Sequence, residues 1–411
     1  MSGRRSAPSQ CDACGGTVVM PVLDFGPMPC SDGFLDEAAL ARDEPLQPLC
    51  VLRCNDCGLL MLQHRLPKEI LFGAGYVYSS AVSSTQRAHL DALARALQED
   101  LGLTPHDALV EVACNDGYLL EQLRSAGLAV LGIEPAPHPA ALARARGLPV
   151  IERFLDPGLA LELRAGGQRP KAVIANNVLA HNARLNEFTA ALAILAGSAP
   201  LIVEVPYLGD ILASLAFDTI YHEHVFYFSL TALDRLFARH GLGIERLQRL
   251  STQGGSLRLF LRQGGRPDAT VQVLLREEAA GSLSLARVED FGWRVRQLRH
   301  RGRKFLHRLK ASGKRIAAYG AAAKGTVLLN QLGLDAHFIE YVVDRNPAKQ
   351  GRWVPGVRLP IVGPERLAAD RPHLLLILPW NLAAEIRAQE AAWEQAGGRF
   401  ILPLPDFRIL Q

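Results

Sequence analysis

The stretch ALVEVACNDGYLLEQLRSAGLAVLGIEPAP, residues 108–137, decides the fold. It has the order of a βαβ unit: an apolar strand, a turn that contains glycine, an amphipathic helix and a second apolar strand. The turn of such a unit approaches a ligand closely, and an acid that ends the second strand can accept both hydroxyl groups of a ribose. Cys114–Gly117 is that turn and Glu134 is that acid. We therefore predict a nucleoside pocket on a parallel sheet.

The turn favours S-adenosylmethionine (SAM) over NAD as the bound nucleoside. Only Gly117 of a possible glycine series is present, so the dinucleotide fingerprint is weak. Glu111 brings a carboxylate that suits the cationic amino-acid tail of SAM better than the pyrophosphate of NAD. The next strand of the sheet lies in KAVIANNVLAHN, and its last residues also face the ligand crevice. The predicted cofactor-binding residues are Glu111, Ala113, Asn115, Asp116, Gly117, Glu134, Asn176 and Asn177.

Two C-x-x-C pairs precede this domain, CDAC at residues 11–14 and CNDC at residues 54–57. Each pair is followed by glycine and places two thiolates on a tight turn, so four soft ligands predict tetrahedral zinc. Redox or disulfide motifs are the alternative, which a cytoplasmic location disfavours because thiols stay reduced there. Four protein ligands leave no open position, so we expect a structural metal held by Cys11, Cys14, Cys54 and Cys57. Cys30 and Cys50 are expected to be packing residues.

Composition limits the class of protein. A chain of 411 residues predicts two or three domains. No apolar run is long enough for a membrane helix and no secretory signal is present, so we expect a cytoplasmic protein without a membrane partner. A net charge of +4 disfavours a dedicated nucleic-acid binder. The basic run 294–310 is interpreted as a solvated helix face, with an anionic ligand or nucleic acid as the alternative.

The densest reactive chemistry lies in FDTIYHEHVFYFSL, residues 217–230. If the segment is an extended strand, the two histidines are i and i+2, whereas zinc-protease sites need i and i+4 on a helix, so a metal site is disfavoured. The composition indicates general acid and base chemistry instead. His181 is also a candidate, with a capping or core role as the alternative.

The loop GYVYSS, residues 75–80, carries four hydroxyl groups before a helix predicted from about Ser84 to Asp100. It suits a polyhydroxylated ligand, or alternatively caps that helix. Further along, STQGGSLRLFLR predicts a strand pair, and residues 270–312 predict helix.

The C-terminal region repeats the order strand, turn and helix in KRIAAYGAAAKGTVLLNQLG, residues 314–333. Its glycines make a poor dinucleotide fingerprint, but a helix N-terminus with Lys324 beside it can hold a diphosphate. Asp344, Asn346 and Lys349 then suit the ribose and base of a nucleotide. A purely structural domain without a ligand is the alternative.

Together these motifs resemble the sugar C-methyltransferases of deoxysugar pathways, which act on thymidine-diphosphate-linked 4-keto sugars. The resemblance spans nearly the whole chain and rests on the cysteine pairs, GYVYSS, EVACNDGYLL, NNVLAHN, YHEHVFYFS, GGSLRLF, AAYGAAAKG and VVDRNPAKQGRWVPG. Two positions depart from the family pattern. Ala113 stands where relatives often have glycine, and His222 can be acidic in relatives, which leaves the identity of the sugar open.

The resemblance implies an α/β protein with three domains. These are a zinc-binding module at 1–72, a class I SAM-methyltransferase Rossmann-like domain at 73–268, and a Rossmann-like domain at 269–411 that helps to seat the sugar nucleotide. It also implies methylation of the carbon next to the ketone, C-3, through an enolate, by a monomer or homodimer. His224 would be the base, Tyr221 and Glu223 would position sugar and base, and Tyr76 and His181 would complete the pocket. The predicted substrate-binding residues are Tyr78, Ser79, Ser80, His222, Lys324, Asp344, Asn346 and Lys349.

Two other classes of function remain as alternatives. A zinc-bearing nucleic-acid methyltransferase is disfavoured by the near-neutral charge. A non-catalytic nucleotide-sugar binding protein is disfavoured by the intact tyrosine, glutamate and histidine cluster.

Overall fold

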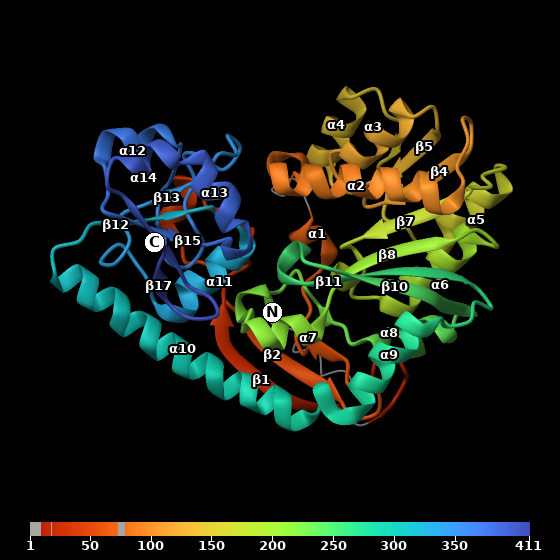
Figure 1. The fold of residues 1–411 in the computed structure, drawn as a ribbon, viewed down its shortest axis with the longest axis horizontal. Helices are drawn as coiled ribbons and strands as arrows, with labels where there is room; N and C mark the ends of the chain where they lie inside the picture. The colour runs from red at the N-terminus through yellow and green to blue at the C-terminus, as the bar shows by residue number, and fades with distance from the viewer. Residues whose placement is uncertain (1–9, 18, 73–78) are drawn as a thin grey trace. The chain divides into compact units, whose positions relative to one another are not determined.

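The computed structural model describes residues 10–17, 19–72 and 79–411 (Figure 1). The chain forms two compact units, each built from several segments. The first unit comprises Met1–Pro21, Leu52–Asp210 and Val225–Ser284. The second unit comprises Val22–Val51, Ile211–His224 and Leu285–Gln411. The three domains predicted from the sequence, at 1–72, 73–268 and 269–411, remain a proposal.

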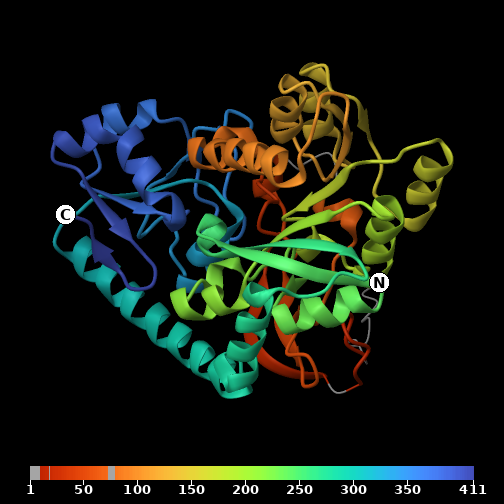
Figure 2. The same cartoon turned by 45° about the vertical axis from the view of Figure 1, so that its right-hand side comes forward.

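A seven-stranded sheet forms the centre of the first unit (Figure 2). Its strand order is β10-β11-β8-β7-β4-β5-β6, in which β8 to β6 run parallel and β10 and β11 form an antiparallel hairpin beside β8. The hairpin is the predicted strand pair. The strands are β4 Ala108–Val112, β5 Ala129–Ile133, β6 Val150–Ile151, β7 Ala172–Asn176, β8 Leu201–Pro206, β10 Leu242–Leu250 and β11 Ser256–Gln263.

The strand order contains a topological switch point. β4 lies at the middle of the sheet, with β5 on one side and β7 on the other, so the connections that leave β4 and β7 diverge. Ligands of open α/β sheets bind at such a switch point, outside the carboxyl ends of the strands. The predicted βαβ unit is confirmed, and its turn and the end of β7 lie at this edge.

Helix α2, Ser84–Leu101, covers one face of this sheet and confirms the predicted helix. Ser83 caps it by accepting the Gln86 N–H, and Gly102 ends it with a φ of 56°. Leucines on its inner face and on α3 pack together against β4, β7 and β8. The other helices of this unit are α1 Lys68–Leu71, α3 Tyr118–Ser125, α4 Pro137–Ala145, α5 Pro157–Ala165, α6 Leu185–Ala196, α8 Leu230–Ala238 and α9 Ala269–Glu277.

The second unit has its own sheet, with the order β14-β13-β12-β15-β16-β17. All its strands run parallel except β17, which pairs with β16 in the antiparallel sense. A core of aliphatic and aromatic side chains, including Tyr319, Ile377 and Phe400, fills this sheet. The strands are β12 Ile316–Tyr319, β13 Val342–Val343, β14 Ile361–Val362, β15 Leu374–Ile377, β16 Arg399–Leu402 and β17 Arg408–Ile409.

The long helix α10, Leu285–Ala311, lies beside α11 in this unit. The predicted helical stretch 270–312 is therefore two helices, because Gly281 at a φ of 97° breaks it after α9. The remaining helices are α11 Ala323–Leu332, α12 Glu365–Asp370, α13 Ala383–Gln389 and α14 Ala391–Gln395, with α7 Leu208–Ser214 earlier in the chain.

A smaller four-stranded sheet has the order β1-β2-β3-β9. Its strands are β1 Val19–Met28, β2 Gln47–Cys54, β3 Leu60–Leu62 and β9 Phe226–Tyr227. The predicted α/β fold with Rossmann-like sheets is thus confirmed. In the part of the chain that the structure describes, no helix is both long and apolar enough to cross a bilayer.

Candidate active site

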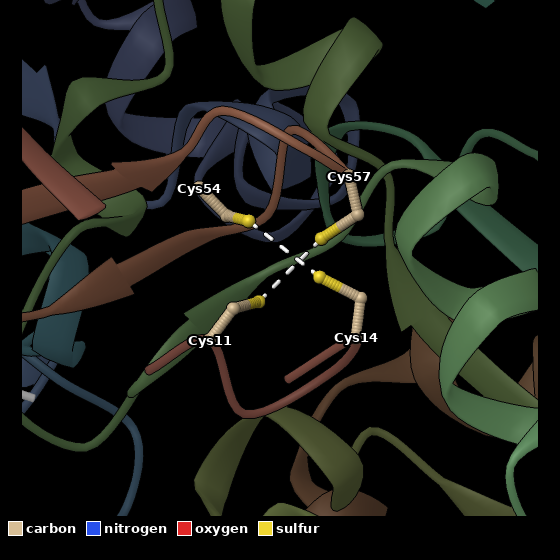
Figure 3. A group of neighbouring side chains, drawn as sticks. All are labelled: Cys11, Cys14, Cys54 and Cys57. Carbon is tan, nitrogen blue, oxygen red and sulfur yellow. Dashed lines mark hydrogen bonds between the residues drawn. The ribbon is translucent and has the colours of Figure 1, made fainter. Parts of the chain in front are cut away.

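Four thiols from two separate turns converge on one point (Figure 3). The sulfur atoms of Cys11, Cys14, Cys54 and Cys57 all lie within 4.8 Å of one another. The Cys11–Cys57 pair is 3.5 Å apart and the Cys14–Cys54 pair is 3.6 Å apart. A tetrahedral zinc ion with Zn–S bonds of about 2.3 Å has S–S edges of about 3.8 Å, so this donor set fits Zn²⁺.

Both cysteine turns have the same local structure. Gly15 N–H donates to the Cys11 carbonyl at 2.9 Å, and Gly58 N–H donates to the Cys54 carbonyl at 3.0 Å. The φ angles of these glycines are 76° and 73°, a region that favours glycine. The hydrogen bond between Cys11 and Cys57 lowers the pKa of the Cys11 thiol to about 5 and raises the pKa of the Cys57 thiol, so one proton is shared within this pair. Because the protein supplies all four ligands, the ion would be structural.

The turn after β4 holds three residues in the left-handed region. The φ angles are 57° at Ala113, 52° at Asn115 and 75° at Gly117. A Cβ at Gly117 would lie 2.4 Å from the side chain of Leu148, so only glycine fits there. Ala113 adopts a conformation that favours glycine, and its N–H donates to the Ile133 carbonyl at 2.7 Å. The turn is therefore fixed against β5.

The predicted ribose acid, Glu134, is buried at the end of β5. Its two carboxylate oxygens accept the N–H groups of Asn115 and Ala136, each at 2.9 Å. Each oxygen keeps a further lone pair for a hydroxyl group. The backbone thus orients this carboxylate next to the cofactor turn before any ligand arrives.

Buried polar atoms in the crevice fit a cofactor. Glu111 Oε2 and both side-chain polar atoms of Asn176 are buried without a hydrogen-bond partner among the described residues, as is Asn177 Oδ1. Burial, and then the charge of Asp116, raise the pKa of Glu111 well above its ordinary value. A cationic amino group and an adenosine would supply the missing partners, as the sequence predicts for SAM.

Ser79 and Ser80 contact Asp116 of the cofactor turn. Both hydroxyl groups donate to the Asp116 carboxylate, Ser80 at 2.7 Å, and the Ala81 N–H donates to it at 2.9 Å. The Ser80 N–H also donates to Asn115 Oδ1 at 2.8 Å. These serines hold the turn after β4 in this structure, and their predicted contact with substrate stays a proposal. Tyr76 and Tyr78 lie outside the described residues.

His181 ends a short 3-10 turn, Leu179–His181, after β7. Its ring stands edge-on to Phe72, with the ring centroids 5.6 Å apart. His181 belongs to the first unit. The other described catalytic candidates, Tyr221, Glu223 and His224, belong to the second unit.

Residues Tyr221–His224 form a tight turn, in which the His224 N–H donates to the Tyr221 carbonyl at 3.0 Å. The segment is therefore not the extended strand considered above, because the strand begins only at Phe226. The turn lets the side chains meet at i and i+3: the Tyr221 hydroxyl lies 2.9 Å from His224 Nε2, and the rings stack at 4.1 Å. The other imidazole nitrogen, Nδ1, lies 2.9 Å from the Thr219 carbonyl.

The Glu223 and His222 side chains are buried. Glu223 Oε1 accepts the Asp32 N–H at 3.1 Å, and burial, then the charge of Asp32, raise the pKa of Glu223 to about 7. His222 is fully buried, with Nε2 3.4 Å from the Pro48 carbonyl. That position favours packing over the predicted substrate contact.

The sequence interpretation missed residues that support the turn at 221–224. Thr219 orients His224 through a backbone carbonyl, which leaves no side-chain signal. Its neighbour Asp218 is fully buried, accepts the Trp380 Nε1–H at 2.8 Å, and has a pKa that burial raises to about 6. Lys324 lies in the same cluster: its ammonium donates to Asn381 at 2.9 Å and lies over the Trp380 ring. Lys324, which the sequence predicts to bind a diphosphate, is thus buried within the fold.

The other predicted nucleotide contacts surround the turn after β12. Asp344 accepts the N–H groups of Ala321 and Asn346, each at 2.7 Å. Lys349 is buried and donates to the Ala321 carbonyl at 2.7 Å, with its ammonium over the Phe34 ring. These groups fix the turn and place a carboxylate beside it.

Known proteins resemble this chain along its whole length. Residues 11–72 match a zinc binding domain, residues 83–247 a methyltransferase domain, and residues 251–405 the C-methyltransferase C-terminal domain. The C-methyltransferase NovU of Streptomyces niveus is 35% identical over 408 residues, which cover 98% of this chain and 96% of NovU.

Two solved structures that resemble this chain each cover less than half of it. Magnesium protoporphyrin IX methyltransferase from Synechocystis PCC 6803 with bound SAH is 19% identical, covers 45% of this chain and 90% of its own, and has a TM-score of 0.37. The same enzyme with bound SAM is 18% identical, covers 45% and 86%, and has a TM-score of 0.35. Neither match bears on the function.

The full-length relative and the three matched domains agree with the site. The cysteine cluster fits the zinc binding domain, and the crevice at β4 and β7 fits the methyltransferase domain and its SAM. The chain therefore belongs to the SAM-dependent C-methyltransferase family that carries an N-terminal zinc-binding domain.

Proposed function

We propose that this enzyme methylates the carbon next to the ketone, C-3, of a nucleotide-linked 4-keto-deoxysugar whose nucleotide is thymidine diphosphate. The motif resemblance and the 35% identity to a C-methyltransferase support this substrate class. The observation that carries the proposal is the Tyr221–His224 pair, because carbon methylation next to a ketone begins with removal of a C–H proton by a positioned base.

The hydrogen bonds of His224 define which nitrogen is basic. The Thr219 carbonyl can only accept, so Nδ1 carries the proton and Nε2 holds the free electron pair. The Tyr221 hydroxyl then donates to Nε2. When the sugar binds, we propose that this hydroxyl turns to the ketone oxygen and that Nε2 takes the C-3 proton. Tyrosine and histidine thereby act on the two ends of the same enolate.

Glu223 supports the developing negative charge on the ketone oxygen. A pKa near 7 leaves a protonated carboxyl group available at neutral pH. A neutral carboxyl that donates to an oxyanion stabilises an enolate without adding a negative charge beside it. SAM, when bound, supplies an electrophilic methyl group to the nucleophilic carbon that these residues generate.

The nucleotide is assigned to the second unit. Asp344 and Asn346 lie at the end of β13, where ribose contacts occur in Rossmann-like sheets. The predicted cytoplasmic location fits the reduced thiols of the zinc site and stays part of the proposal.

Mass spectrometry of the products tests the proposal directly. The protein is incubated with methyl-labelled SAM and a panel of nucleotide-linked 4-keto sugars, with total RNA as a separate acceptor. We expect one labelled methyl group on the sugar, bonded to carbon as shown by NMR of the labelled methyl, and none with His224→Ala. Label on RNA, or a methyl group on sugar oxygen, would refute the proposed substrate.

A further inference from the structure

A cavity of about 520 Å³ lies within the second unit, apart from every residue assigned above to cofactor, substrate or catalysis. The end of β1, the segment before β2, α10, α11 and the loop around Gly356 line it. Sites for small molecules have volumes of about 300–1,000 Å³ and combine apolar walls with a few polar groups. Three features of its lining indicate what it would bind.

The first feature is a cation without a counterion. Arg299 of α10 uses Nε to donate to the Gln331 carbonyl at 2.8 Å, and its side chain is half-buried. Within residues 10–17, 19–72 and 79–411, Arg299 forms no ion pair. Glu44 supplies the carboxylate in the lining of the cavity. It accepts the Gly356 N–H at 2.7 Å and interacts with the charge of Arg358 rather than with Arg299. A ligand with an acidic group would pair the guanidinium.

The second feature is an acceptor without a donor. Gln331 is 7% exposed, and its Nε2 donates to the Phe25 carbonyl at 2.7 Å. Because a carbonyl can only accept, the orientation of the amide is fixed. Its Oε1 is buried and has no partner among the residues that the structure describes. An O–H or N–H group of a ligand would satisfy it.

The third feature is an apolar part of the lining, called the wall here. Phe25 and Pro27 belong to this wall, and Leu46 at its edge is 50% exposed. A planar ring would cover these side chains and remove the apolar surface of Leu46 from water.

We propose that this cavity binds a small cyclic organic anion with one hydrogen-bond donor: its acidic group pairs with Arg299, its donor meets Gln331 Oε1, and its ring covers Leu46. The inference does not depend on the proposed sugar substrate, because no residue of that site lines the cavity.

Fluorescence titration with 8-anilinonaphthalene-1-sulfonate tests the site, because this probe combines two ring systems, a sulfonate and an N–H. The full-length protein is saturated with S-adenosylhomocysteine first, so that the cofactor crevice is filled. We expect one saturable site. N-phenyl-1-naphthylamine, which has the same rings without the sulfonate, should bind at least about tenfold more weakly because it lacks the charge-assisted contact.

Three variants locate the probe. Arg299→Gln removes the cation and Leu46→Glu puts a like charge at the rim, and each should weaken binding at least about tenfold. Arg301→Gln, on the exposed face of the same helix, should bind like the wild type. Leu46 is exposed, so its variant decides the question even if Arg299→Gln does not fold. Absence of saturable binding, equal binding of the uncharged analogue, or wild-type affinity of a folded Arg299→Gln or Leu46→Glu variant would overturn the proposal.

Discussion

Asp344 repeats, in the sheet of the second unit, both backbone contacts that Glu134 makes in the sheet of the first. Glu134 accepts the Asn115 N–H from the turn after β4 and the N–H two residues beyond itself, each at 2.9 Å. Asp344 accepts the Ala321 N–H from the turn after β12 and the N–H two residues beyond itself, each at 2.7 Å. Each Rossmann-like sheet thus holds a carboxylate where such folds contact a ribose.

This equivalence predicts that the two acids serve two different nucleosides. Glu134→Gln should weaken S-adenosylhomocysteine binding about tenfold and leave thymidine diphosphate binding unchanged, because one charged hydrogen-bond acceptor is lost. Asp344→Asn should have the reverse effect. Isothermal titration of both ligands against both variants measures this, and each variant is the control for the other. If Asp344→Asn binds thymidine diphosphate as the wild type does, the second carboxylate only fixes its turn.

Glu111 should make cofactor binding depend on pH. Burial raises its pKa in the free protein, so it stays protonated at pH values where an exposed glutamate is charged. A bound cationic amino group favours the carboxylate, so SAM binding should release a proton, and affinity should rise with pH up to the pKa of the free form. Titration calorimetry in two buffers of different ionisation enthalpy counts the protons. Glu111→Gln should abolish the release and weaken binding about tenfold or more, whereas Glu121→Gln should do neither.

Local patterns predicted much of this structure. The βαβ unit at 108–137, the hairpin before Gln263 and the cysteine turns depend on spacing and on glycine at fixed positions, so one stretch of sequence determines each of them. The two C-x-x-C pairs lie 40 residues apart, yet the preference of zinc for four thiolates was sufficient to join them.

Contacts between distant segments and through the backbone could not be predicted. The Asp32 N–H donates to Glu223 across 191 residues of sequence, and no sequence pattern at either position indicates this contact. Thr219 acts through its carbonyl, which every residue type possesses. Ser79 and Ser80 were assigned to substrate because hydroxyl groups suit a sugar, but a carboxylate at Asp116 accepts the same donors. The turn at 221–224 is closed by a hydrogen bond between the His224 N–H and the Tyr221 carbonyl, which no side-chain pattern indicates.

Removal of zinc should unfold the N-terminal module rather than stop the chemistry directly. Cys54→Ser breaks the set of four thiolates, so the bound metal should fall from one ion per chain to none and the melting temperature should fall clearly, since structural zinc stabilises the fold that holds it. Plasma mass spectrometry and calorimetry measure these quantities. Cys50→Ser, whose thiol contacts Asp24 outside the cluster, should keep its zinc. A Cys54→Ser protein with full metal content would exclude this site.

His224→Ala should abolish proton removal from the sugar while cofactor binding stays intact. General base catalysis contributes about 10²–10⁴-fold, so kcat should fall by that factor. Exchange of the C-3 proton with deuterium oxide, followed by NMR, separates this step from methyl transfer. Tyr221→Phe should slow the exchange less, because it keeps the base but loses the hydroxyl that contacts it. His300→Ala, on the exposed face of α10, is the matched control. Exchange at the wild-type rate in His224→Ala would assign the base elsewhere.

Glu223 should set an alkaline limit to activity. Its pKa is raised to about 7, so the carboxyl is protonated below that pH and charged above it. If the protonated form donates to the enolate oxygen, kcat/KM should fall as the pH rises through about 7, because the donor is lost and a negative charge replaces it.

Two variants assign that limit to its residue. Glu223→Gln keeps an N–H donor and cannot ionise, so the alkaline fall should disappear even though the maximum rate is lower. Asp32→Asn removes the charge that, after burial, raises the pKa of Glu223, so the fall should move to lower pH. A shift of the alkaline fall to lower pH in Asp32→Asn requires that the carboxyl groups of Asp32 and Glu223 interact. If Glu223 had only a structural role, the dependence of kcat/KM on pH would stay unchanged. An alkaline limit that survives in Glu223→Gln belongs to another group, and the oxyanion role of Glu223 would then be wrong.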